Sequence, residues 1–175
     1  AYARLWGAYL ARTYGAFADQ ALNQSAYYQP NGNLFLYLAG FSKMGGIEKV
    51  NKAILKSLYP ASGSGWEAWS VYDSFIDARY FPRYAIRGFS ASRVKFLWHF
   101  VQANHWKHIL VGHINLAAAI WLINLRKSDT RITLMAHGIE VWSKQKGFKK
   151  WLLQRADKII AVSNYTKSQL VTVNG

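Results

Sequence analysis

Short apolar runs alternate with longer amphipathic stretches from residue 33 to the last residue given. The apolar runs predict strands at 34–38, 66–72, 108–111, 132–135 and 158–162, as in a sheet buried on both faces. Between them, apolar residues recur at helical spacing and predict helices at 47–58, 94–101, 117–125, 148–155 and from 164 onward. Residues 73–90, rich in arginine and aromatic side chains, show neither pattern.

Short apolar strands that alternate with helices predict right-handed βαβ units and one parallel sheet. The expected fold class is therefore α/β, with a Rossmann-like, doubly wound parallel sheet. Ligands of such sheets bind beyond the carboxyl ends of the strands. Six residues that follow predicted strands are expected to converge on that rim: Ser42, Gly45, His113, His137, Glu140 and Ser163.

The first part of the chain has a different pattern. Residues 1–22 carry an apolar stripe at helical spacing, which predicts an extra N-terminal helix, although two glycines weaken it. Residues 20–33 are polar and end in the turn sequence PNG. The domain boundary is therefore expected at residue 32, with a helical extension and linker over 1–32 and the Rossmann-like domain over 33–175.

Charge is the unusual feature of the composition. The 175 residues contain 22 Lys and Arg against 8 Asp and Glu, a formal net charge of +14. Such a surface attracts polyanions, either nucleic acid or the anionic face of a membrane. No apolar run reaches the roughly 18 residues of a spanning helix, so any membrane association is expected to be peripheral.

Several classes of chemistry find no support in the sequence. Cysteine is absent, which excludes disulfides and thiolate ligands. His99, His105 and His108 lie close together in sequence but have no neighbouring carboxylate, so no metal site is expected. Ser163 has neither a G-x-S-x-G context nor a Ser-His-Asp arrangement, and it is expected to cap the following helix.

Four segments, in order, resemble the sequence motifs of family 4 glycosyltransferases. They are residues 45–50 (GGIEKV), 113–115 (HIN), 136–142 (AHGIEVW) and 156–166 (ADKIIAVSNYT). The resemblance implies the acceptor-side, N-terminal half of a GT-B fold, in which two Rossmann-like domains face each other across a cleft. No glutamate pair spaced eight apart is present, which the donor-binding second domain of the family usually carries. The donor domain is therefore expected to be absent from these residues, and the fragment alone to be inactive.

The resemblance also implies an activity and a set of roles. The parent enzyme would be a retaining hexosyltransferase that uses a nucleotide-sugar as co-substrate and no bound cofactor or metal. Gly45 and Gly46 would approach the donor phosphate or sugar, which suits backbone N–H groups at a helix N-terminus. His113 would contact the reacting sugar as a hydrogen-bond partner or proton acceptor. Ser42, His137 and Glu140 would line the acceptor cleft.

Some of these residues also have structural interpretations. A glycine pair can serve a turn alone, and either histidine can be a cap or a loop residue bonded to backbone. Glu140 is expected to pair with nearby lysines. Asn115 is expected to be the N-cap of the helix that follows it.

One basic segment interleaves cations with aromatic rings, a composition that favours lipid headgroups. Its residues are Trp142, Lys144, Lys146, Lys149, Lys150 and Trp151. The domain is therefore expected to lie peripherally on the cytoplasmic, inner face of the membrane. For the enzyme that the resemblance implies, the expected acceptor is a lipid-linked or cell-envelope saccharide, and the expected role is polysaccharide biosynthesis. Nucleic acid is the less favoured partner, because no RNA-binding signature is present. The alternative function is a free-standing basic module that binds nucleic acid or anionic lipid without catalysis.

Overall fold

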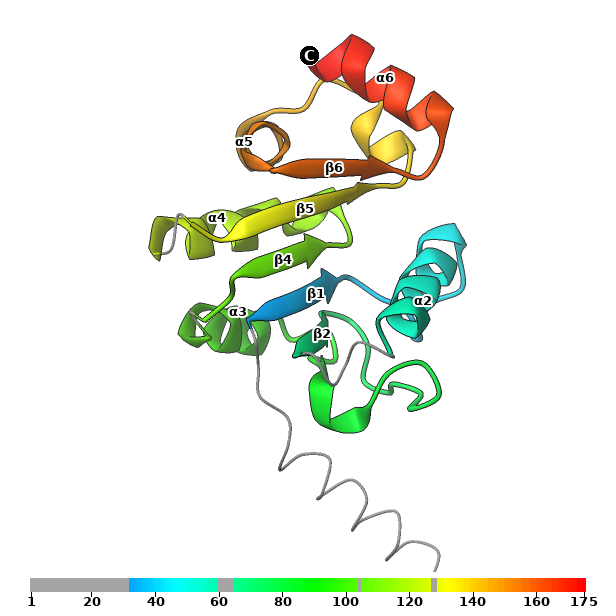
Figure 1. The fold of residues 1–175 in the computed structure, drawn as a ribbon, viewed down its shortest axis with the longest axis vertical. Helices are drawn as coiled ribbons and strands as arrows, with labels where there is room; N and C mark the ends of the chain where they lie inside the picture. Colours follow the sequence, from blue (N-terminus) through cyan, green and yellow to red (C-terminus); the bar gives the residue numbers. More distant parts are fainter. Residues whose placement is uncertain (1–31, 60–64, 104, 127–128) are drawn as a thin grey trace, which may run out of the picture.

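The computed structural model describes residues 32–59, 65–103, 105–126 and 129–175 (Figure 1). The expected N-terminal helix and nearly all of the 1–32 extension lie outside these residues. No helix in the described part of the chain is long and apolar enough to cross a bilayer.

One sheet of six strands organises the described residues, and every neighbouring pair in it is parallel. From edge to edge the strands are β3 (Ile86–Gly88), β2 (Trp66–Ser70), β1 (Asn33–Tyr37), β4 (His108–Val111), β5 (Arg131–Ala136) and β6 (Lys158–Ala161). The α-helices described are α2 (Gly46–Leu58), α3 (Arg93–Gln102), α4 (Ala117–Arg126), α5 (Gly147–Arg155) and α6 (Asn164–Asn174). The same described residues also form three short 3₁₀ turns, η2 (Arg83–Ala85), η3 (Ile114–Leu116) and η4 (Ile139–Val141).

The strand order reverses between β1 and β4, which lie side by side in the middle of the sheet. Their register pairs Asn33 with His108 and Leu36 with Val111. This 3-2-1-4-5-6 order is that of a doubly wound Rossmann-like sheet, so the predicted fold class is confirmed. The reversal opens a crevice-forming position at the carboxyl ends of β1 and β4, where ligands of such folds bind.

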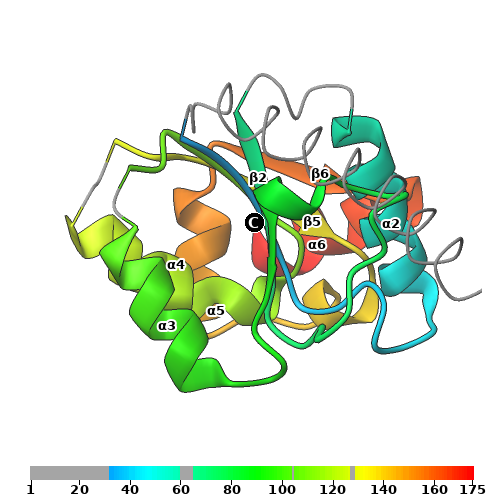
Figure 2. The same ribbon diagram turned by 90° about the horizontal axis from the view of Figure 1, so that it is seen from below.

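The two faces of the sheet have separate apolar cores. Leu34, Leu36 and Trp69 point to the face covered by α3, α4 and α5. Phe35 and Tyr37, which alternate with them along β1, point to the face covered by α2. Figure 2 shows α2 on the opposite side of the sheet from α3, α4 and α5. Burial on both faces explains why the strands are continuous apolar runs in sequence.

The segment without a readable pattern, residues 73–90, contains η2 and the edge strand β3. β3 has only three residues, and its register is given by β2, with Ala68 opposite Ile86 and Ser70 opposite Gly88. Its pairing therefore comes from a neighbouring strand and not from its own periodicity. This is why sequence analysis predicted five strands and missed the sixth.

Candidate functional site

The loops that follow β1, β4 and β5 carry most of the residues predicted for the site. They meet at the carboxyl edge of the sheet, next to the position where the strand order reverses. β1 leads into residues 38–45, β4 into Gly112 and His113, and β5 into His137 and η4. The predicted convergence of these strand ends follows from the parallel register of the strands.

His113 caps the short turn η3 that follows β4. Its backbone is extended (φ −166°), and its Nδ1 accepts a hydrogen bond from the Asn115 N–H at 3.0 Å. The cap is therefore His113, and the expectation that Asn115 caps the helix is wrong. Because Nδ1 is an acceptor, the proton of the neutral ring lies on Nε2.

Electrostatics favour the neutral form of His113. The side chain is buried, and this burial is the main cause that holds the pKa of His113 below its ordinary value. The Glu140 carboxylate raises that pKa, while His137 and Lys149 lower it further. At neutral pH the ring is thus an uncharged donor at Nε2.

His137 lies beside His113, with ring centroids 6.2 Å apart and planes inclined by 28°. Its Nε2 lies 2.8 Å from the Gly112 carbonyl oxygen, which can only accept, so Nε2 donates. Its Nδ1 is buried and has no hydrogen-bond partner among the described residues. The ring is therefore anchored through Nε2, and its Nδ1 is enclosed by protein beside His113.

Glu140 holds the turn that carries His137. One carboxylate oxygen accepts hydrogen bonds from the N–H groups of His137 at 2.6 Å and Gly138 at 3.0 Å. The expected pairing with lysines does not occur, since no ion pair among the described residues includes Glu140. Its negative charge instead fixes the β5 loop and acts on His113 through space.

The predicted phosphate loop ends at the start of α2. Gly45 is the N-cap and is extended, and Gly46 is the first helical residue. A Cβ at Gly45 would lie 2.5 Å from an oxygen of Glu48, whereas a Cβ at Gly46 would meet no atom within 4 Å. The Glu48 carboxylate therefore lies beside the positive N-terminal end of α2, where negative charge is stabilised. Of the two glycines, Gly46 is the one with open space beside it.

Asp73 is a residue of this region that sequence analysis missed. Its carboxylate is fully buried and accepts from three consecutive N–H groups, of Gly40 (2.8 Å), Phe41 (3.0 Å) and Ser42 (2.8 Å). The hydroxyl of Ser70 donates a fourth bond at 2.8 Å. The backbone of the β1 loop is thus tied to the end of β2. The predicted cleft residue Ser42 is held by its N–H, and its side chain is exposed.

Two further predictions concern the segments after β5 and β6. Ser163 caps α6, as predicted, since its hydroxyl accepts from the Thr166 N–H at 3.1 Å. In the basic segment, Lys144, Lys146 and Lys150 are exposed and Lys149 is partly buried. Trp142 and Trp151 are partly buried and pack against the core, so the lysines reach the surface without these two rings.

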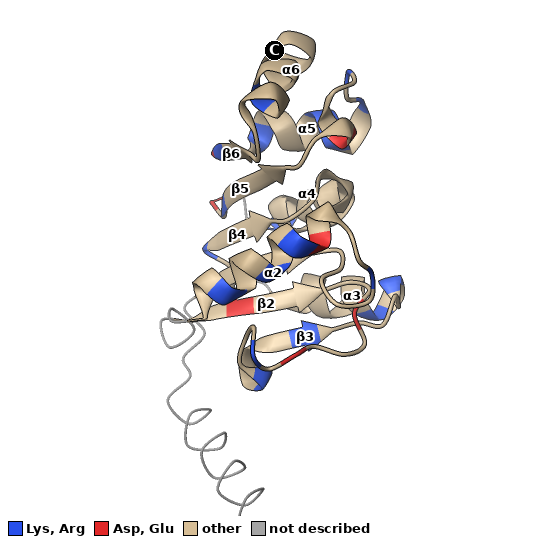
Figure 3. Cartoon of the chain, turned by 90° about the vertical axis from the view of Figure 1, so that its right-hand side faces the viewer, with Lys and Arg blue, Asp and Glu red and all other residues tan. Residues whose placement is uncertain are grey.

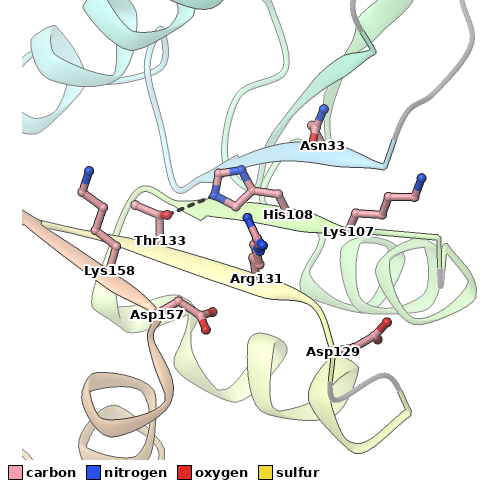
Figure 4. Close-up of a pocket in the computed structure, with 8 residues that line it drawn as sticks. All are labelled: Asn33, Lys107, His108, Asp129, Arg131, Thr133, Asp157 and Lys158. Carbon is pink, nitrogen blue, oxygen red and sulfur yellow. Dashed lines mark hydrogen bonds between the residues drawn. The ribbon is translucent and has the colours of Figure 1, made fainter.

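A hollow of about 810 Å³ lies at the opposite end of the sheet, among residues that begin strands or precede them (Figure 4). Asn33, Lys107, His108, Asp129, Arg131, Thr133, Asp157 and Lys158 line it. Both signs of charge are mixed there, and the His108–Thr133 contact is 3.0 Å. Ligands of doubly wound sheets bind at the other, carboxyl end, so the rim with His113 is the better candidate site. No group of three or more acidic or histidine side chains in the described residues is arranged to hold a metal ion.

The fold and the rim together define a Rossmann-like domain of the kind that forms one half of a GT-B fold. The family described as Glycosyltransferase Family 4 matches residues 65–175, more than half of the chain. The chain therefore belongs to this family of glycosyltransferases, and the resemblance found in the motifs is confirmed. No curated protein and no solved structure matches it.

Proposed function

We propose that this domain binds the sugar acceptor of a retaining hexosyltransferase that uses a nucleotide-sugar donor. The acceptor is a lipid-linked or cell-envelope saccharide, met at the cytoplasmic face of the membrane. Membership of the family supports glycosyl transfer. The observation that carries the site is the pair of stacked histidines, His113 and His137, next to the reversal of strand order.

His113 acts as a hydrogen-bond donor in this proposal. Its Nδ1 is engaged by the Asn115 N–H, so Nε2–H is the group free to meet a sugar oxygen. A neutral donor orients the reacting sugar by a hydrogen bond to one of its oxygens, and it does not remove a proton. Of the two roles that the sequence allowed, hydrogen-bond partner and proton acceptor, the hydrogen-bond donor is therefore the one proposed.

His137 and the β1 loop complete the acceptor side. His137 lines the acceptor side next to His113, and the bond from its Nε2–H to the Gly112 carbonyl fixes its ring there. Gly46, at the open side of the α2 N-terminus, lets a donor phosphate or sugar approach the backbone. Glu140 and Asp73 hold the loops in place and touch no substrate.

The test is sugar transfer from a labelled nucleotide-sugar, by this domain combined with a separately expressed nucleotide-sugar-binding domain. His113→Ala is expected to lower kcat by about 10²-fold, because the reacting sugar is then held less well in position. His113→Asn retains a capping acceptor and an N–H donor, so it is expected to recover part of the rate.

His105→Ala is the matched control. His105 is exposed and lies near the amino end of β4, away from the rim, so transfer is expected to be unchanged. The proposal would be contradicted if His113→Ala transferred sugar at the wild-type rate, or if the combined wild-type domains transferred none.

A further inference from the structure

The outward surface of α3, α4 and α5 combines cations with exposed apolar side chains. None of the three helices contains Asp or Glu. They carry six Lys and Arg residues, of which Lys149 and Arg155 are partly buried and the others exposed: Arg93, Lys95, Arg126, Lys149, Lys150 and Arg155. Figure 3 shows blue segments on α3 and α5, whereas the acidic residues lie on other elements and loops.

The solvent side of α4 is apolar along its length. Ala118 and Leu125 are exposed, Trp121 and Leu122 are partly buried, and the first charged residue is Arg126 at the last position. A surface helix of a soluble domain normally carries polar residues on this side. An apolar outer side therefore indicates a partner that covers it.

The neighbouring helices extend this apolar surface. α4 packs between α3 and α5. On α3, Val94 and Trp98 are one turn apart and 80% and 64% exposed. On α5, Phe148 is 47% exposed, and its ring centroid lies 5.1 Å from that of Trp121. Exposed apolar side chains thus run across all three helices and are bordered by cations.

We propose that this three-helix face, with Val94, Trp98 and Leu125 inserted and the cations around them, docks the domain on an anionic lipid bilayer. Amphipathic surfaces of this kind lie in the headgroup region, with apolar residues below it and Lys and Arg at its level. A second copy of the chain fits less well, because pairing two such faces would bring cations against cations.

The face is continuous with the candidate site. α5 contacts the turn η3 that follows His113, and Lys149 lies close enough to lower the pKa of His113. The helices α4 and α5 both begin at the carboxyl edge of the sheet, the edge that bears the rim. Docking through this face therefore brings the sugar-binding rim to the headgroup of a lipid-linked acceptor. This deepens the proposed function, on which the identity of the acceptor rests.

The experiment measures partition of the full 175-residue chain onto vesicles of equal phosphatidylcholine and phosphatidylglycerol by sedimentation. The variant Trp98→Ser with Leu125→Ser is compared with Phe75→Ser with Val171→Ser. The four residues are similarly exposed, at 64%, 62%, 66% and 60%, but the second pair lies outside the three helices. The first variant is expected to bind at least about tenfold more weakly, and the second to bind as the wild type does.

Charge is tested in the same way. Arg93→Gln, Lys95→Gln and Lys150→Gln together are expected to weaken binding by about fivefold per residue. Lys56→Gln, Lys158→Gln and Lys167→Gln remove the same number of exposed cations elsewhere, and they are expected to have a much smaller effect. An equal loss of vesicle binding in the two triple variants would overturn the proposal, because binding would then depend on net charge and not on this face.

Two other outcomes would also overturn it. One is equal binding of the wild type to pure phosphatidylcholine vesicles, or no binding to either. The other is a wild-type dimer in sedimentation equilibrium that the Trp98 and Leu125 changes dissociate, which would make the face a contact between copies. No sugar is present in these measurements, so their failure leaves the transfer proposal standing, and failure of the His113 test leaves partition unaffected.

Discussion

At the scale of single residues, Asp73 is the side chain that ties the β1 loop to the end of β2. Its buried carboxylate accepts four hydrogen bonds, three of them from consecutive backbone N–H groups of the β1 loop. Hydrogen bonds to a buried charge are among the stronger contributions to stability, and an unpaired buried donor is costly. The carboxylate therefore fixes the loop that leads to Gly45 and Gly46.

Asp73→Asn keeps the shape of the side chain but turns one acceptor oxygen into an N–H₂ donor that faces other donors. The free energy of unfolding is expected to fall by about 2–4 kcal/mol, measured by urea denaturation. Asp77→Asn removes a partly buried carboxylate that bonds the exposed side chain of Arg79, and it is expected to shift the midpoint much less. Equal effects of the two changes would show that the loop does not depend on Asp73.

His113 gives a pH dependence whose sign follows from its lowered pKa. The unfolded chain titrates near 6.5 and the folded chain below that value, so between them the unfolded state binds more protons. The stability contributed by neutral His113 is therefore complete above pH 6.5 and is lost as the pH falls through the folded value. His113→Asn is expected to lose less stability than the wild type between about pH 7 and pH 5.

The measurement is the free energy of unfolding across that pH range. The pKa of His108 is also lowered, chiefly by burial, and it adds a loss of the same sign that both proteins share. The contribution of His113 is thus the difference between the two profiles. Parallel profiles would mean that His113 titrates alike in the folded and unfolded states.

At the scale of elements, the close contact of β4 with β1 depends on Gly112. A Cβ at Gly112 would lie 2.9 Å from Tyr37 Cβ, 3.1 Å from the Phe35 ring and 3.2 Å from the Leu36 carbonyl oxygen. These neighbours belong to the core of β1 and cannot move aside easily. Gly112→Ala is therefore expected to lower the free energy of unfolding by about 1–3 kcal/mol in urea denaturation.

Gly46→Ala is the matched control for that change. A Cβ there meets nothing within 4 Å, and alanine favours the helix that begins at this residue. Its stability is expected to equal or slightly exceed that of the wild type. If Gly46→Ala were the more destabilising of the two, the packing argument would be wrong.

The elements differ in how far sequence alone predicts them. Leu34, Leu36, Ile109 and Val111 are buried on one face and Phe35 on the other, so β1 and β4 read as continuous apolar runs and were predicted. β3 was missed because its three residues are placed by pairing with β2.

The site shows the same division between local and long-range causes. His113 and His137 were predicted as rim residues because each directly follows a strand or its glycine. Asp73 was not, because its partners at Gly40–Ser42 are more than thirty residues away in sequence. No local pattern predicted the turn η3 before α4. Because this turn contains Asn115, the capping residue is His113 at its start and not Asn115.

At the scale of the whole molecule, charge is the dominant long-range term. The sequence has 22 Lys and Arg against 8 Asp and Glu, so the formal net charge of the folded chain is +14 however its ion pairs form. A compact state with this charge is destabilised by self-repulsion. Salt shortens the screening length from about 30 Å at 0.01 M to about 8 Å at 0.15 M, and the repulsion weakens with it.

The melting temperature is therefore expected to rise with sodium chloride between these concentrations, by about 2–4 °C for each 1 kcal/mol of repulsion relieved. Chloride is the suitable anion, because sulfate stabilises proteins through exclusion from their surface as well. Lys144→Glu with Lys146→Glu lowers the formal charge from +14 to +10 at two exposed positions, so its rise is expected to be smaller. A melting temperature that falls with salt would mean that ion pairs such as Arg155–Asp157 outweigh the repulsion.

The same repulsion is relieved when cations of the three-helix face meet anionic lipid. Anionic vesicles are therefore expected to raise the melting temperature at low salt, and this increase is expected to disappear as the salt concentration rises, because salt screens the attraction.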